Sequence, residues 1–181
     1  MRKLIALALV LVTMFTLVAG PVGASNPTVT ITVNAATVSI TNSHATWNIT
    51  ALVGAVNVDD IVYFSATGAQ DDGYSQIVNT GNVAVDIEVQ GTNFEGGAYD
   101  WTLAASTGVE TYSLYANNGS QGATYGVEVK SAAYNDICTS LAASNNWNWS
   151  MKFTAPSGFN GNDDGSAKTA TVTLAVTQSP P

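Results

Sequence analysis

The chain is poor in reactive and in cationic side chains. Its 181 residues include one cysteine, Cys138, and one histidine, His44. Its only arginine is Arg2, and the cations after residue 24 are Lys130, Lys152 and Lys168. A single cysteine excludes an intrachain disulfide. The scarcity of Lys and Arg argues against nucleic acid and against anionic membrane surfaces as partners, because both are bound through those side chains.

Acidic residues are more numerous than basic ones. The chain has 13 acidic residues and a formal net charge of −8 at pH 7, and every acidic residue lies after residue 24. We therefore expect a well-solvated surface that repels its own copies at low ionic strength.

The first 24 residues have the pattern of a secretory signal peptide. Arg2 and Lys3 precede an apolar run from Leu4 to Val18, and small residues lead to Ala24. The apolar run is shorter than the roughly 20 residues that span a bilayer. We predict cleavage after Ala24 and a secreted, extracellular or cell-surface protein; an uncleaved leader that serves as a membrane anchor is the alternative.

Residues 25–181 are predicted to form a single β-rich domain. Eleven short runs alternate between apolar and polar residues and are separated by Gly, Asn, Asp and Ser. This spacing favours an all-β, two-layer β-sandwich of jelly-roll or immunoglobulin-like topology, with a barrel as the alternative. The predicted strands are 28–33, 36–41, 46–50, 60–65, 75–79, 83–89, 99–103, 111–115, 124–129, 147–153 and 169–176.

Two further local features follow from the pattern. Residues Asn79–Asn82, with sequence Asn-Thr-Gly-Asn, predict a hairpin turn, because Gly and Asn tolerate positive φ. Residues 132–143 place Tyr134, Ile137, Cys138 and Leu141 at helical spacing. We predict a short helix there, capped by Ser131, with Cys138 facing the core. The alternative for Cys138 is an exposed thiol that cross-links two molecules.

Known catalytic motifs do not occur in the sequence. The Gly-x-Ser-x-Gly, His-Glu-x-x-His, phosphate-loop and Cys-x-x-Cys patterns are all missing. His44 lies in a turn-like stretch, where an exposed turn residue is the simpler interpretation than a general base. We assign no catalytic residue and expect the protein not to be an enzyme.

Three loops carry clustered oxygen ligands of the kind that calcium prefers. They are Asp59-Asp60, Gln70–Gly73 and Gly161–Gly165. None has the spacing of an EF-hand, and Asp-Gly is also common in turns. We expect no cofactor, with a structural Ca²⁺ as the alternative.

Four tryptophans suggest a possible carbohydrate-binding surface, on which sugar rings would stack. Trp147 and Trp149 share one strand face, but Met151 and Phe153 continue that face and make a core stripe the better interpretation. Trp47 and Trp101 are the other two. Candidate N-glycosylation sites, each an Asn-x-Ser/Thr sequence, occur at Asn48, Asn118 and Asn148.

The segment that follows the predicted cleavage site alternates cleanly. It comprises Thr28, Val29, Thr30, Ile31, Thr32 and Val33. Such a terminal strand can pair within its own sheet, or it can leave and complete the sheet of a neighbouring subunit through main-chain hydrogen bonds. We regard Thr28–Val33 as a candidate donor strand; an ordinary strand within the chain is the alternative.

Parts of the sequence resemble small exported β-sandwich proteins of bacterial and archaeal envelopes. The carrying residues are Gln76–Ile87, Trp101–Leu103, Met151–Pro156 and Thr171–Ala175. The Asn-Thr-Gly-Asn segment is similar to that of TasA/camelysin-like biofilm-fibre proteins and of archaeal bundling-pilus subunits. The resemblance implies a jelly-roll subunit that donates its N-terminal strand to the next subunit, which would be Thr28–Val33 here.

These observations predict an extracellular structural protein. It would be the subunit of a cell-surface filament, pilus-like fibre or biofilm matrix, with copies of itself as partners and β-strand donation or edge pairing as the mechanism. The alternative is a secreted β-sandwich module that binds carbohydrate or another surface ligand, with or without calcium.

Overall fold

The computed structural model describes residues 35–64, 73–117, 124–160 and 166–180. It divides the chain between Asn34 and Ala35, and all described residues belong to the second part. The predicted signal peptide and the candidate donor strand Thr28–Val33 lie outside the described residues. Within the described part, no helix is long and apolar enough to cross a membrane.

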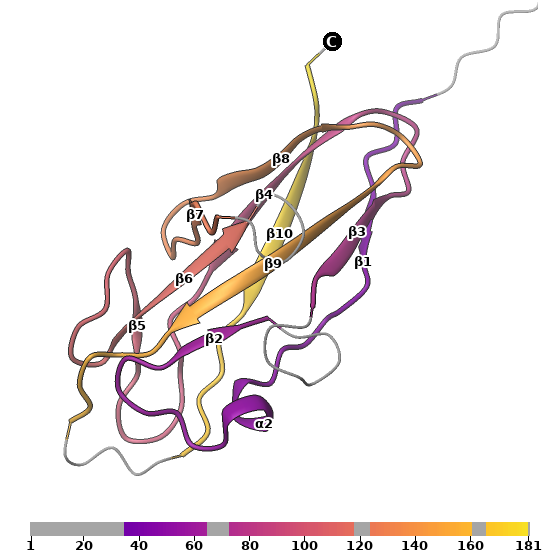
Figure 1. Cartoon of the computed structure of the whole chain (residues 1–181). Helices are drawn as coiled ribbons and strands as arrows, with labels where there is room; N and C mark the ends of the chain where they lie inside the picture. The colour runs from indigo at the N-terminus through magenta and orange to yellow at the C-terminus, as the bar shows by residue number, and fades with distance from the viewer. Residues whose placement is uncertain (1–34, 65–72, 118–123, 161–165, 181) are drawn as a thin grey trace, which may run out of the picture. The chain divides into compact units, whose positions relative to one another are not determined.

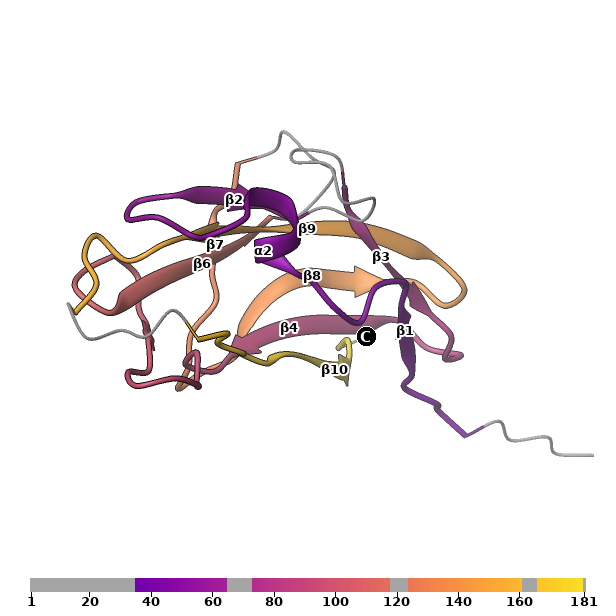
Figure 2. The ribbon, with the colours of Figure 1, turned by 90° about the horizontal axis from the view of Figure 1, so that it is seen from below.

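The described part is an all-β structure with two sheets, which confirms the predicted fold class (Figures 1 and 2). The smaller sheet has three strands in the order β10-β4-β8, all antiparallel. Its strands are β4 (Val85–Gly91), β8 (Asn135–Leu141) and β10 (Val172–Gln178).

The larger sheet follows the order β1-β3-β9-β6-β5, with β2 paired to β9 and β7 paired to β6. Figure 2 shows β9, β6 and β2 in one layer and β8, β4 and β10 in the other. The strands of the larger sheet are β1 (Ile40–Asn42), β2 (Ile61–Tyr63), β3 (Ser75–Asn79), β5 (Thr102–Leu103), β6 (Thr111–Asn117), β7 (Val127–Glu128) and β9 (Asn146–Thr154).

The core lies between the two sheets and follows from the period-2 alternation. In β4 the side chains of Val85, Ile87 and Val89 are each 0% exposed, while the residues between them are half-buried. From the other sheet, alternate residues of β9 face the same core; of these, Met151 and Phe153 are buried. Each aliphatic side chain of this size stabilises the fold by about 1.5–3 kcal/mol when it leaves water.

The predicted hairpin at Asn79–Asn82 is wrong, because the two strands it joins belong to different sheets. Strand β3 pairs with β1 and β9, whereas β4 pairs with β10 and β8. The buried Asn79 side chain makes this crossing possible. Its Nδ2 donates to the carbonyls of Val83 (2.8 Å) and Leu141 (2.9 Å), and its Oδ1 accepts from the Gly81 N–H (3.0 Å). A side chain thus supplies the bonds that a hairpin ladder would otherwise provide.

The predicted helix at 132–143 is also wrong. Residues Asn135–Leu141 form β8, which pairs with β4. The register shifts between Val85 and Ile87 and again between Ile87 and Glu88. Extra residues on β8 therefore place Ile137, Cys138 and Leu141 toward the interior at a spacing that mimics a helix. Cys138 is half-buried on a strand instead of on a helix.

The described helix, α2 (Ile49–Val53), lies where a strand over 46–50 was predicted. Asn48 is its N-cap, and the Asn48 side chain accepts a hydrogen bond from the Ala51 N–H at 3.1 Å. Gly54 ends the helix with φ 74° and ψ −134°, a backbone conformation that glycine adopts readily because it has no Cβ. In Figure 1 this helix lies below β2.

Candidate functional site at the edges of the smaller sheet

At each of its two edges the smaller sheet ends in a strand, β10 or β8, whose one described neighbour within the sheet is β4. Strand β10 pairs with β4 over all seven of its residues, from Val172 opposite Gly91 to Gln178 opposite Val85, without a register shift. Its sequence, Val-Thr-Leu-Ala-Val-Thr-Gln, contains no charged residue and no proline. Charge, proline and bulges are the features by which β proteins protect their edges. No described strand pairs with the other edge of β10, called the β10 edge below, and the seven residues of β10 have none of these protections.

The main-chain groups at the β10 edge can be assigned from the hydrogen bonds at its two ends. The Thr92 N–H donates to the Thr171 carbonyl (2.9 Å), and the Ser179 N–H donates to the Ala84 carbonyl (3.0 Å). Odd-numbered positions therefore bond toward β4. In an antiparallel ladder successive residues point alternately to the two sides. The N–H and C=O groups that point away from β4 are consequently those of Val172, Leu174, Val176 and Gln178.

The inward side chains of β10 are incompletely covered. Val172, Leu174 and Val176 pack against the core but remain half-buried, in contrast to the fully buried inward row of β4. The inward row of β10 thus keeps apolar area that an added strand would bury, at roughly 25 cal/mol per Å².

The opposite edge of the sheet, on β8, differs in shape and charge. Two register shifts interrupt its pairing with β4, and Ser140 adopts a positive φ of 53°. Bulges of this kind twist an edge strand and hinder pairing with a further strand. The edge residue Asp136 is exposed and adds a negative charge.

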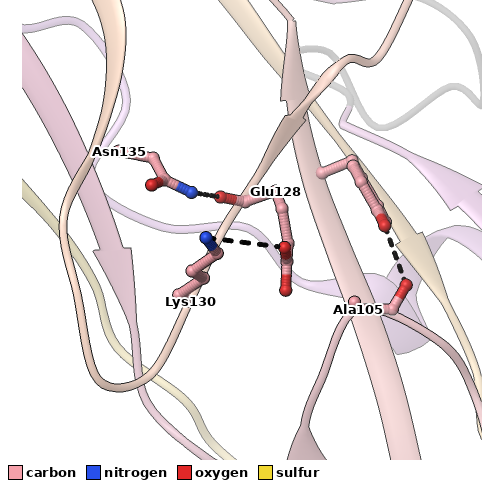
Figure 3. Close-up of polar contacts among 5 residues, drawn as sticks. Ala105, Glu128, Lys130 and Asn135 are labelled. Carbon is pink, nitrogen blue, oxygen red and sulfur yellow. Dashed lines mark hydrogen bonds and ion pairs between the residues drawn. The ribbon is translucent and has the colours of Figure 1, made fainter.

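Strand β7 and the segment after it also bind to the start of β8 (Figure 3). The Asn135 Nδ2 donates to the Glu128 carbonyl at 2.6 Å. Lys130 Nζ lies 3.9 Å from a carboxylate oxygen of Glu128, so two charged side chains flank this part of the edge. The same close-up labels Ala105, whose carbonyl accepts a hydrogen bond from the Tyr115 hydroxyl at 2.8 Å.

A hollow of about 500 Å³ lies beside β8. Its walls include the apolar residues Val127, Ile137, Leu141 and Trp147, together with polar groups such as Asp136, Ser140 and Asn145. Ile137 and Leu141 are already buried. Val127 and Trp147 are half-buried, so this hollow also holds apolar surface that an added strand would cover.

Asp86 of β4 connects the two edge strands. Its Oδ1 accepts hydrogen bonds from the Ser179 hydroxyl, after the end of β10, and from the Ser140 N–H at 2.8 Å, in the irregular part of β8. These two donors, Ser179 first, lower the pKa of Asp86 below its ordinary value. Burial raises the pKa of the nearby Cys138 thiol, and the negative charge of Asp86 raises it further.

The structure places the three predicted glycosylation asparagines in different settings. Asn48 is exposed, but its Oδ1 is occupied as the N-cap of α2 and also accepts from the Thr50 hydroxyl at 2.8 Å. Asn148 is half-buried in β9, where its Oδ1 accepts from Gln76 Nε2 at 3.3 Å. Asn118 lies outside the described residues.

The candidate calcium loops are only partly described. Asp60 lies in the first of them, and its Oδ2 accepts from the Asn57 N–H at 2.6 Å. The acidic residues of the other two loops lie outside the described residues. Among the residues that the structure does describe, no cluster of three or more His, Cys, Asp or Glu side chains could hold a metal.

Aromatic residues and His44 are used in packing. Trp149 is buried, and Trp47, Trp101 and Trp147 pack half-buried against the core. The His44 ring lies edge-on to Phe64 with centroids 5.9 Å apart, and Ser43 Oγ lies 2.8 Å from His44 Nδ1. All four tryptophans therefore contact the core, Trp149 from a buried position and the other three from half-buried ones.

The β10 edge itself was missed by reasoning from the sequence, although the strand was predicted. One sequence feature does point to this edge, because residues 169–178 contain no charged residue. The sequence alone, however, does not show which strands lie at the end of a sheet. Comparison with known proteins adds no assignment: no family model matches the chain, and no curated protein and no solved structure matches it.

Proposed function

We propose that this protein is an exported structural subunit that assembles with copies of itself by β-strand addition. The observation that carries the proposal is the β10 edge: seven uncharged residues with outward main-chain groups and half-covered apolar side chains. A strand added to such an edge gains main-chain hydrogen bonds and buries side chains at every second position. The function is then mechanical, and the product is a filament or matrix outside the cell.

Two features of the sequence support the same proposal. The signal-like segment at residues 1–24 favours export. The next segment, Thr28–Val33, has the alternation that a donated strand needs, with Val29, Ile31 and Val33 on one face.

Electron microscopy of the exported chain, residues 25–181, tests the proposal. We expect filaments from the intact chain and none after deletion of residues 25–34. Ile31→Asp places a charge on the apolar face of the donor strand and is expected to prevent assembly, whereas the matched control Thr30→Ser is expected to assemble normally. An intact chain that stays monomeric over a range of salt and pH would overturn the proposal.

A further inference from the structure

We infer that the acceptor site is the β10 edge, and that residues 28–33 of a second copy add to it antiparallel, so that subunits join head to tail. This inference rests on the proposed function and specifies its partner, its site and its polarity. Three features of the molecule support it: the difference between the two edges, the position at which the chain enters the sandwich, and the apolar residues exposed at one end.

The choice of edge follows from what each edge offers an incoming strand. Val172, Leu174, Val176 and Gln178 direct their N–H and C=O groups outward. The candidate donor has six alternating residues and the acceptor has seven, and neither contains a charge. At β8, by contrast, the strand is bulged and flanked by Asp136 and the Lys130–Glu128 ion pair. The β10 edge is therefore the better acceptor by the regularity of its outward hydrogen-bonding groups and by charge.

The polarity follows from where the donor segment is attached. We call the end of the sandwich that carries Asn79–Asn82 the turn end. The Asn82 side chain donates to the Ala35 carbonyl (2.8 Å) and accepts from the Thr37 N–H (2.7 Å), so the chain enters the sandwich at the turn end. Strand β10 also finishes there, because Ser179 bonds to Ala84.

The two possible strand directions then give different assemblies. In antiparallel addition the donor's residue 33 lies beside the start of the acceptor's β10, away from the acceptor's turn end. The donor's turn end then faces the acceptor's opposite end, which is a heterologous contact that repeats into an open filament. In parallel addition the two turn ends would meet, and reciprocal exchange would close a dimer.

Exposed apolar residues gather at the end opposite the turn end. We call this the far end, defined by Pro156–Gly158, which follow the last residues of β9. Val109 is 64% exposed and forms a β-bridge with Gly158. Val58 and Ile61, each 49% exposed, lie on either side of Asp59 and Asp60. The backbones of these two aspartates form hydrogen bonds with the backbones of Pro156 and Ala155. Antiparallel addition places the turn end of the donating copy, with Val38 at 37% exposure, against this apolar surface.

The test uses variants that change one edge at a time. Val176→Pro removes an outward N–H while leaving the bonds to β4, and proline is tolerated in edge strands at such positions. Thr173→Lys adds a charge to the same edge and serves if the proline variant unfolds. Thr139→Lys is the matched change on β8, where Thr139 is also exposed. Unfolding midpoints in urea check that each variant is folded.

We expect Val176→Pro and Thr173→Lys to raise the concentration needed for filament growth by about tenfold, as the loss of edge hydrogen bonds and apolar contact implies. We expect Thr139→Lys to assemble like the unmodified chain. Val176→Pro chains keep the donor strand, and chains that lack residues 25–34 keep the acceptor edge. A mixture of the two therefore has one working donor and one working acceptor per pair, and we expect a 1:1 dimer by mass photometry.

Each contrary result has a distinct meaning. An unmodified chain that does not assemble contradicts the proposed function itself. Filaments that form normally from Val176→Pro and Thr173→Lys but not from Thr139→Lys would leave the function standing and move the acceptor to β8. Closed dimers of the unmodified chain would overturn the antiparallel, head-to-tail arrangement.

Discussion

At the scale of single residues, buried and half-buried polar side chains hold together parts of the sandwich that the backbone ladder does not join. Asn79 bonds to two carbonyls from separate segments and is 0% exposed. Asp86 does the same for the two edge strands through Ser140 and Ser179. Such residues are rare in the core because an unpaired buried polar group destabilises the fold by about 1–3 kcal/mol.

Asp86 leads to a prediction about pH. Its pKa is lowered in the folded protein, so the stability that it contributes is present above the pKa of the unfolded chain and is lost as pH falls through the folded-state value. We expect Asp86→Asn to unfold more easily than the unmodified chain near pH 6, and the difference in unfolding free energy to shrink toward zero at strongly acidic pH.

Urea denaturation over a series of pH values measures this difference. Glu88→Gln is the matched control, because it removes one carboxylate from the same strand and the same outer face. A difference for Asp86→Asn that stays constant with pH would show that the Asp86 charge does not contribute to stability.

At the scale of secondary-structure elements, β8 shows how a bulged strand can imitate a helix in sequence. The sequence over 132–143 has apolar residues three and four apart, which is typical of an amphipathic helix. Bulges shift the side chains along the strand and produce the same spacing. Nothing in the local pattern separates the two cases, because the deciding interaction is the pairing with β4, some fifty residues earlier in the chain.

Ser140 offers a test of this bulge. It has φ 53°, a conformation that costs ordinary residues about 1–2 kcal/mol and β-branched residues more. We expect Ser140→Gly to be close to neutral in unfolding free energy and Ser140→Val to destabilise the protein by about 2 kcal/mol. Thermal and urea unfolding measure both.

The same two substitutions at Ser131, an exposed residue before β8, serve as a comparison that holds side-chain chemistry constant. Equal effects at the two positions would contradict a left-handed backbone at Ser140.

At the scale of the whole molecule, charge opposes the proposed assembly. The chain carries a formal net charge of −8, and like-charged copies repel each other over a distance set by ionic strength. The acceptor strand β10 is itself uncharged, so salt acts mainly on the approach of two subunits and less on the contact that they form.

We therefore expect filament growth to accelerate as salt rises from about 0.01 M to about 0.15 M, where the screening length falls from roughly 30 Å to roughly 8 Å. Light scattering during assembly measures the rate. Replacing Asp136 and Glu88 with their amides should weaken the salt dependence. A growth rate that decreases over this range would indicate that attraction between charges drives assembly.

The sequence alone determined the β-rich class, because alternation with period two recurs between turn residues throughout residues 25–181. It also placed the strands of the core correctly in runs such as Ser75–Asn79 and Trp147–Phe153, whose inward residues are determined by polarity at each position. Strand formation and the choice of the inward face are local properties, because they depend on residues that are neighbours along the chain.

Only the tertiary structure decided which strand pairs with which, and hence where the sheets end. Asn79–Asn82 crosses between the two sheets, and this crossing is stabilised by hydrogen bonds from the Asn79 side chain to the carbonyls of Val83 and Leu141. Asn135–Leu141 form a strand, and not part of the predicted helix, because they pair with β4. The β10 edge exists because β10 has one described neighbour, β4. Which strands lie at an edge depends on pairing between residues far apart in the sequence. An alternating pattern cannot reveal this, because central strands and edge strands have the same alternation.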